Sequence, residues 1–163
     1  MKAFTVLVNG VLYSKLMTQS NTRITCAGGI FLARSTGRWL LLLRNNGRTA
    51  GTWGLAGGKQ EPSDDTPYQA LIREIEEELG TIPAISKTIP IERYSSPDDA
   101  FYYNTYVLLV ENEFVPTLND EHSGYCWVDY DRWPKPLHQG VKTTLSSRTT
   151  RAKLETILDL LRD

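Results

Sequence analysis

Apolar residues in this chain fall into short runs separated by polar, glycine-containing segments. Runs rich in β-branched and aromatic residues predict strands at 24–34, 39–44, 86–94, 101–111 and 125–130. Two earlier runs, 3–8 and 11–16, flank Asn9-Gly10, which is the strongest short signal for a β-hairpin. We therefore expect an N-terminal hairpin ahead of a strand-rich core.

A helical period replaces the strand pattern between Thr66 and Gly80. Thr66 suits the N-cap, Pro67 suits the first helical position, and Gln69 completes a capping box. Gly80 is a natural C-terminal stop. At about 100° per residue, one face of this helix is apolar and would face a core; it is formed by Tyr68, Leu71, Ile72, Ile75 and Leu79.

Two further helices are predicted, around 137–145 and at 150–161. Strands on both sides of one well-marked helix, followed by C-terminal helices, predict an α/β or α+β fold. In this fold a mixed β-sheet is sandwiched between helices. Because no repeat, low-complexity segment or linker interrupts the pattern, we expect a single domain over 1–163, with 1–20 as an N-terminal hairpin extension.

Composition narrows the classes of partner. The 163 residues carry a net charge of −1 and no long basic tract, which argues against tight non-specific nucleic-acid binding but leaves a small nucleotide or an RNA 5′ end open as substrate. No apolar run approaches the length of about 20 residues that crosses a bilayer, so no membrane partner is expected. Cys26 and Cys126 lie far apart in apolar or strand-like contexts; a disulfide is one alternative, but we expect two buried, reduced thiols and a cytoplasmic location.

Three carboxylates gather on one side of the predicted helix. Glu74, Glu77 and Glu78 are spaced i, i+3, i+4, whereas Glu76 points away. Such a cluster is either a solvated acidic face or a cation site, because Mg²⁺ binds oxygen ligands and bridges carboxylates to phosphates. Taken alone, the helix favours the solvated face, because runs of charged residues usually mark exposed faces.

The spacing around this helix resembles the signature of the Nudix hydrolases. That pattern is a glycine, five residues, a glutamate, seven residues, then Arg-Glu, an aliphatic residue, any residue, Glu-Glu, any residue and a glycine. The matching positions here are Gly58, Arg73, Glu74, Ile75, Glu77, Glu78 and Gly80. Residues 134–138 (PKPLH) also resemble a segment of small bacteriophage Nudix proteins.

The chain departs from this pattern in its loop. Counted back from Arg73, the first glutamate of the pattern falls on Asp65, and the segment between Gly58 and Asp65 is one residue longer than the pattern. Thr81 replaces the usual aliphatic residue, and Ala56 stands where many members have proline. We expect Asp65 to position Arg73 and the loop.

The resemblance implies a Nudix fold and a site that uses Mg²⁺, with Mn²⁺ as an alternative. It implies Glu74, Glu77 and Glu78 as metal ligands and Arg73 as the residue that orients them. Glycines at 57–58 allow close approach of the backbone, so we expect the Gly58 carbonyl as a further ligand.

The catalytic base in this family comes either from the glutamates of the signature pattern or from a glutamate on a later loop. Glu77 and Glu78 are therefore candidates, and Glu121 is a third, because Asn119–His122 resembles the glutamate-histidine loop of diadenosine polyphosphate hydrolases and RNA 5′-pyrophosphohydrolases. The other interpretation of Glu121 is a solvated loop residue. We expect substrate contacts from four further residues: Arg44, Trp53, Lys59 and Tyr103.

These observations favour a metal-dependent pyrophosphohydrolase. Its substrate would be a nucleoside diphosphate linked to another moiety, as in a nucleoside triphosphate, a dinucleoside polyphosphate, ADP-ribose or an RNA 5′ end. The alternative is a catalytically weak Nudix-fold module with a nucleotide-binding or regulatory role. Asp65 and the longer loop, which depart from the pattern, are the reasons for this alternative. A third reading is an acidic-surface interaction protein. Monomer and homodimer are both expected states.

Overall fold

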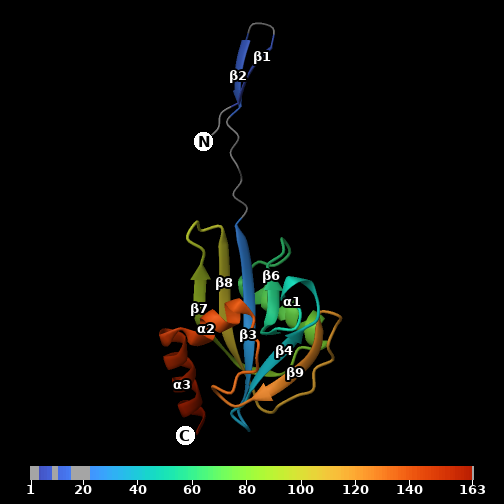
Figure 1. Ribbon diagram of the computed structural model, residues 1–163, viewed down its shortest axis with the longest axis vertical. Coiled ribbons are helices and arrows are strands. Elements are labelled where there is room, and N and C mark those ends of the chain that lie inside the picture. Colours follow the sequence, from blue (N-terminus) through green and yellow to red (C-terminus); the bar gives the residue numbers. More distant parts are fainter. Residues whose placement is uncertain (1–3, 9–10, 16–22, 163) are drawn as a thin grey trace.

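The computed structural model describes residues 4–8, 11–15 and 23–162, and Figure 1 shows helices on both faces of a central sheet. The strands of this sheet are β3 (Ile24–Ala33), β4 (Trp39–Arg44), β5 (Trp53–Gly54), β6 (Ala56–Lys59), β7 (Ile85–Ser95), β8 (Phe101–Val110) and β9 (His122–Val128). The helices are α1 (Pro67–Leu79), α2 (Gln139–Ser146) and α3 (Arg148–Arg162), with a short 3-10 turn at Gly47–Thr49. The expected mixed sheet between helices is confirmed.

Strand β3 is the centre of the sheet, whose order is β5-β4-β3-β8-β7. It runs parallel to β8 over its whole length and antiparallel to its other partners. Its first half pairs with β6 and its last residues pair with β4, while β9 extends the sheet from β4. This sharing of β3 brings Gly57–Lys59 against Cys26–Gly28, and so fixes the start of the candidate site.

Each face of the sheet buries its own hydrophobic cluster. The α1 face packs Leu71, Ile75 and Leu79 against Phe31 of β3. The opposite face is covered by α2 and α3 and buries residues that include Trp39, Leu41, Val107, Leu145 and Leu154. Continuous apolar strands such as 39–44 are explained by this arrangement, because both of their faces are covered.

The sequence pattern missed two strands and misplaced the start of β9. Strands β5 and β6 were not predicted because Gly54, Gly57 and Gly58 carry no strand signal; their pairing with β4 and β3 determines their conformation. Strand β9 begins at His122, three residues before the predicted start, so His122 belongs to the sheet and not to the preceding loop. The additional residues of β9 are extended because His122 pairs with Arg44 of β4, a tertiary contact that the local sequence does not encode.

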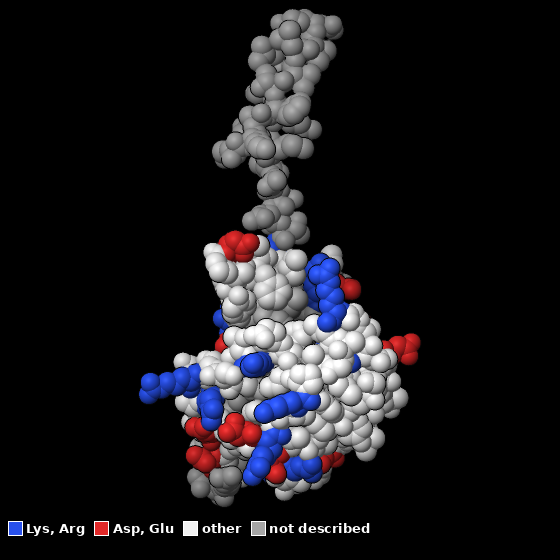
Figure 2. Space-filling view, in the orientation of Figure 1, with Lys and Arg blue, Asp and Glu red and all other residues white. Residues whose placement is uncertain are grey.

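The N-terminal hairpin is confirmed in its strands. β1 (Phe4–Val8) and β2 (Val11–Lys15) pair antiparallel as a separate two-stranded sheet, and the predicted turn at Asn9-Gly10 lies outside the described residues. Cys26 and Cys126 are free thiols, as expected, but both are only half-buried. Within the described ranges, no helix has the length and apolar character that spanning a membrane requires. On the face drawn in Figure 2, Lys and Arg side chains are interspersed with Asp and Glu side chains in the lower part of the view and form no long basic stripe.

Candidate active site

Helix α1 carries the acidic residues and begins as predicted. The Thr66 hydroxyl accepts a hydrogen bond from the Gln69 backbone N–H, the Gln69 side chain accepts from the Thr66 N–H, and Gly80 closes the helix in the left-handed region at φ 76°. Buried Leu71, Ile75 and Leu79 anchor one side of the helix to the sheet. The neighbouring side then faces β6.

The three glutamates of α1 differ in depth. The side chain of Glu77 is 55% exposed and that of Glu74 is 15% exposed, whereas Glu78 is only 2% exposed. The Glu78 carboxylate accepts a hydrogen bond of 2.9 Å from the Gly57 backbone N–H. Burial outweighs this bond and, with the negative charges of Glu74 and Glu121, raises the pKa of Glu78 to about 8. A solvated acidic face is therefore wrong for Glu78.

Two adjacent glycines allow β6 to lie between β3 and the carboxylates. Gly57 has φ 136°, and a Cβ there would lie 2.1 Å from the Ala27 carbonyl oxygen. A Cβ on Gly58 would lie 2.5 Å from the carboxyl carbon of Glu74. Neither position tolerates a side chain in this conformation, but for different reasons: Gly57 is confined by backbone, and Gly58 by the Glu74 carboxylate.

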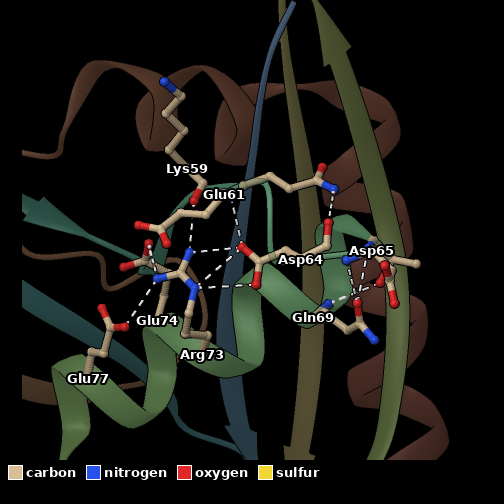
Figure 3. Close-up of polar contacts among 10 residues, drawn as sticks. Lys59, Glu61, Asp64, Asp65, Gln69, Arg73, Glu74 and Glu77 are labelled. Atoms are coloured by element: carbon tan, nitrogen blue, oxygen red, sulfur yellow. Dashed lines mark hydrogen bonds and ion pairs between the residues drawn. The ribbon is translucent and has the colours of Figure 1, made fainter.

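Arg73 holds the acidic cluster together (Figure 3). Its guanidinium contacts Asp64 at 3.1 Å, Glu74 at 3.1 Å and Glu77 at 3.2 Å, and it donates to the Lys59 carbonyl at 3.0 Å. Asp64 receives bonds from both Nε and Nη2 of Arg73. Arg73 lowers the pKa of Asp64, and the carboxylates around Arg73 raise the pKa of the guanidinium.

The expectation for Asp65 is wrong: Asp64 pairs with Arg73. The Asp64 side chain is 7% exposed and points at the guanidinium, whereas Asp65 is exposed and its backbone N–H donates to the Gln69 side chain at 2.6 Å. Counted forward from Gly58, Asp64 stands where the Nudix pattern has glutamate. The extra residue therefore lies at the helix cap, after Asp64, and the segment between Gly58 and Asp64 has the length of the pattern.

A cavity of about 320 Å³ opens beside this cluster. Its walls come from strands β3, β4, β5, β6 and β8, from the loop that carries Glu121, and from helices α1 and α2. Six residues predicted for the site line it together: Arg44, Gly58, Lys59, Glu74, Tyr103 and Glu121. Two cationic residues, Arg44 and Lys59, thus line the same cavity as Glu74 and Glu121.

Glu121 reaches the cavity because β4 holds its loop. The Asn45 backbone N–H donates to the Glu121 carbonyl at 2.7 Å, and the Asn119 side chain accepts from the Glu121 N–H at 3.0 Å. The side chain itself is exposed. Burial raises the pKa of Glu74, and the charges of Glu77 and Glu121 raise it further, while Arg73 opposes the shift. Glu121 is therefore electrostatically coupled to both Glu74 and Glu78.

Trp53 does not share this cavity. Its side chain packs against the cluster under α2 and α3, and its backbone joins Pro136 and His138 by two hydrogen bonds. The structure therefore gives no support to Trp53 as a substrate contact. Tyr103, in contrast, crosses the sheet above Gly28, where a Cβ would lie 2.0 Å from its hydroxyl oxygen.

Cys26 and His138 line the cavity without having been predicted. Residue type gave no signal for Cys26, because its place in the cavity depends on partners distant in the sequence. The His138 side chain caps α2 by accepting from the Gly140 N–H at 3.2 Å. Burial lowers the pKa of His138, and the charge of Arg44 lowers it further. An acceptor side chain just before a helix was the one available clue to His138.

The carboxylates suit a hard divalent cation in type, although their present arrangement is not a formed metal site. No group of three or more His, Cys, Asp or Glu side chains among residues 4–8, 11–15 and 23–162 is arranged to hold a metal ion. Arg73 occupies Glu74 and Glu77, while Glu78 bonds to Gly57. Burial raises the pKa values of Glu74 and Glu78, neighbouring carboxylates raise them further, and a bound cation would favour the ionised form of both groups.

Comparison with solved structures supports the same fold. A MutT NUDIX hydrolase from Burkholderia pseudomallei is 27% identical with a TM-score of 0.58, over 76% of this chain and 96% of that one. RenU, a Nudix hydrolase from M. smegmatis, is 22% identical with a TM-score of 0.63, over 94% and 96%. The NUDIX domain of Shewanella oneidensis NrtR, complexed with ADP ribose, is 19% identical with a TM-score of 0.61, over 81% and 88%.

None of the curated proteins matches the chain. A family model described as NUDIX domain matches residues 23–146, which is well over half of the sequence. This span includes the sheet, α1 and the cavity described above. The chain therefore belongs to the Nudix family, and this membership supports a hydrolase that acts on pyrophosphate bonds.

Proposed function

We propose that the protein is a metal-dependent hydrolase that cleaves the diphosphate linkage of a nucleoside diphosphate joined to another moiety. The cavity carries this proposal, because it sets Arg44 and Lys59 beside the carboxylates of Glu74 and Glu121. A diphosphate needs both: cations to bind its oxygens, and carboxylates to hold a metal and accept a proton.

The side chains divide this work. Arg44 and Lys59 bind phosphate oxygens and draw the anion into the cavity. Arg73 acts as a positioning residue, since it contacts Glu74 and Glu77 and is itself held by Asp64. Glu74, Glu77 and Glu78 would hold Mg²⁺ or Mn²⁺, with the Gly58 carbonyl as a further ligand. Bound there, such a cation would neutralise phosphate charge and make a water more acidic.

We assign Glu121 as the base that accepts the proton of the attacking water. Its exposed carboxylate lines the cavity, whereas Glu78 is buried and already accepts a hydrogen bond from Gly57. Water attacks one phosphorus, its proton passes to the Glu121 carboxylate, and the bridging P–O bond breaks to release a phosphate-bearing fragment. Candidate substrates remain nucleoside triphosphates, dinucleoside polyphosphates, ADP-ribose and RNA 5′ ends; the NrtR domain with ADP ribose supports a nucleotide-derived ligand.

A second candidate is a nucleotide-binding module with weak catalysis. One observation favours it: Arg73 forms ion pairs with Glu74 and Glu77, two of the three carboxylates that a metal would need. A module that keeps these pairs in the presence of Mg²⁺ would bind a nucleotide phosphate through Arg44 and Lys59 without turnover.

A substrate panel with Mg²⁺ or Mn²⁺ separates the two candidates. Released phosphate and nucleotide products are measured for each substrate class, and metal binding is measured by isothermal titration. We expect turnover that EDTA abolishes, and metal binding that Glu77→Gln and Glu78→Gln sharply weaken. Glu76→Gln is the matched control, because Glu76 is exposed on the same helix. Undiminished metal binding in both site variants would refute the metal site, and nucleotide binding without turnover would favour the module.

A further inference from the structure

A second cavity adjoins the catalytic one. It has a volume of about 350 Å³, within the usual range for small-molecule sites, and lies between the β7–β8 strands and the start of α2. The two cavities share Tyr103, His138 and Val141 as lining residues. A molecule whose phosphates contact Arg44 and Lys59 would therefore extend past Tyr103 into this second space.

One wall of the second cavity is aromatic. Tyr94, Phe101 and Tyr103 form a row in which successive ring centroids lie 6.3 Å and 6.4 Å apart. The facing wall is the first turn of α2, where Gly140 has no side chain to fill the gap. A slot with rings on one side and a helix on the other admits a flat group, which gains stacking and apolar burial there.

The cavity also contains one carboxylate, that of Glu92 on β7. The Thr144 hydroxyl donates to Glu92 Oε2 at 2.5 Å and the Thr150 hydroxyl donates to Oε1 at 3.4 Å, so both oxygens are held in place. No ion pair to Glu92 occurs among the described residues. Because a carboxylate offers about four acceptor positions, Glu92 retains capacity for further donors.

This charge sets the direction in which a nucleotide would bind. Glu92 repels phosphate, whereas Arg44 and Lys59 in the adjoining cavity attract it. The base, and not the phosphates, would therefore enter the aromatic cavity. A base that offers two neighbouring N–H donors satisfies Glu92 best, and guanine does so with its ring N–H and exocyclic amino group, whereas adenine places an acceptor nitrogen beside its amino group.

We propose that this second cavity is a base-recognition site that selects guanine through Glu92. The inference rests on the proposed function for the position of the phosphates, but it concerns recognition and not turnover. It narrows the substrate class to guanosine nucleotides whose phosphates reach Arg44 and Lys59.

Equilibrium binding tests the inference without catalysis. Isothermal titration in EDTA with the full chain compares guanosine, inosine and adenosine monophosphates; inosine lacks only the exocyclic amino group of guanosine. We expect guanosine monophosphate to bind at least about tenfold more tightly than adenosine monophosphate, with inosine monophosphate between them. If the three nucleotides bound with affinities equal within about twofold, the proposal would be overturned without measurements on any variant.

Variants then locate the effect. Glu92→Gln replaces one acceptor oxygen with an N–H₂ donor, so we expect the preference for guanosine over adenosine monophosphate to fall at least about tenfold while adenosine monophosphate binding is unchanged. Glu111→Gln, an exposed acidic position on the surface, is the control. Tyr94→Ala should weaken all three nucleotides and leave the fold intact, because Tyr94 is already 45% exposed.

The outcomes separate the inference from the proposed function. Guanosine monophosphate selectivity that Glu92→Gln removes, without turnover of any diphosphate, would refute the proposed function and support the inference. Turnover with no guanine preference, or with a preference that survives Glu92→Gln, would refute the inference alone. Thermal midpoints of all variants, measured in parallel, show that a lost preference is not lost folding.

Discussion

Two neighbouring aspartates show how strongly environment determines the role of a single residue. Asp64 is held by Arg73, whereas Asp65 is exposed at the helix cap. We expect Asp64→Asn to lower Mg²⁺ affinity by about 10- to 100-fold, because Arg73 then loses the partner that orients it towards Glu74. Asp65→Asn should change affinity by less than about twofold. Isothermal titration with Mg²⁺ measures both.

Thermal midpoints provide the control for this pair. Asp64→Asn should also lower the midpoint more than Asp65→Asn, since only Asp64 has a charged partner. If Asp65→Asn weakened metal binding as much as Asp64→Asn, the assignment from the structure would fail and the count back from Arg73 would be correct after all.

A substitution of Glu121 distinguishes most sharply between a catalytic base and an ordinary loop residue. Glu121→Gln keeps the shape of the side chain and removes its basicity. If Glu121 takes the proton of the attacking water, turnover should fall by at least about a hundredfold while the thermal midpoint barely moves. The neighbouring loop variant Asp120→Asn is the matched control, because Asp120 is also exposed. Near-normal turnover of Glu121→Gln would return the base to Glu77 or Glu78.

At the scale of elements, helical periodicity predicts on which side of a helix a side chain lies, but not how deeply it is buried. It placed Glu74, Glu77 and Glu78 on one side of α1, and the structure agrees that these side chains lie near Arg73 and β6. The three nevertheless range from 2% exposed for Glu78 to 55% for the Glu77 side chain. The difference arises because β6 crosses only one part of that side of the helix.

The glycines of β6 provide a prediction at this scale. Gly57→Ala places a Cβ against the Ala27 carbonyl at a positive φ, so we expect a loss of about 1–3 kcal/mol in the free energy of unfolding. In Gly58→Ala the three atoms nearest the new Cβ belong to the Glu74 carboxylate, at the end of a side chain that can move. It should therefore spare folding and weaken Mg²⁺ binding.

Urea denaturation and metal titration of the two variants separate these effects. The expected pattern is reciprocal: Gly57→Ala is the less stable, and Gly58→Ala is the weaker in metal binding per folded molecule. A Gly58→Ala protein with unchanged Mg²⁺ affinity would show that the position of the Glu74 carboxylate in this structure is irrelevant to the site.

At the scale of the whole molecule, one buried histidine makes the free energy of unfolding depend on pH. His122 is 5% exposed, neither ring nitrogen has a hydrogen-bond partner among the described residues, and burial together with the charge of Arg44 lowers its pKa to about 4. An unfolded histidine has a pKa of about 6.5, so the unfolded state binds the proton first as pH falls. The free energy of unfolding should therefore decrease as pH falls from about 6.5 towards 4.

His122→Phe removes the titrating group and two unpartnered nitrogens. We expect this variant to lose about 1–3 kcal/mol less stability than the natural chain between pH 7 and pH 4.5. Urea denaturation at the two pH values measures the difference. The chain has one other histidine, His138, which is only half-buried, so His138→Gln should flatten the profile less. An equal effect of both variants would contradict the assignment to His122.

The local pattern by itself determined most elements of this protein. Thr66, Pro67, Gln69 and Gly80 define α1 through bonds between near neighbours, and the predicted helix matches the observed one. The strands at 39–44 and 101–110 follow from β-branched, aromatic and apolar runs. Such signals are local, because capping, period and strand propensity act over only a few residues.

Only the tertiary structure decided how these elements form a site. It chose Asp64 over Asp65 as the partner of Arg73, buried Glu78, excluded Trp53 from the cavity and brought His138 and Glu92 beside Tyr103. Each of these outcomes depends on residues far apart in the sequence that β-sheet pairing brings together. Burial and charge then act through space, and they determine which of several similar side chains is positioned to do chemistry.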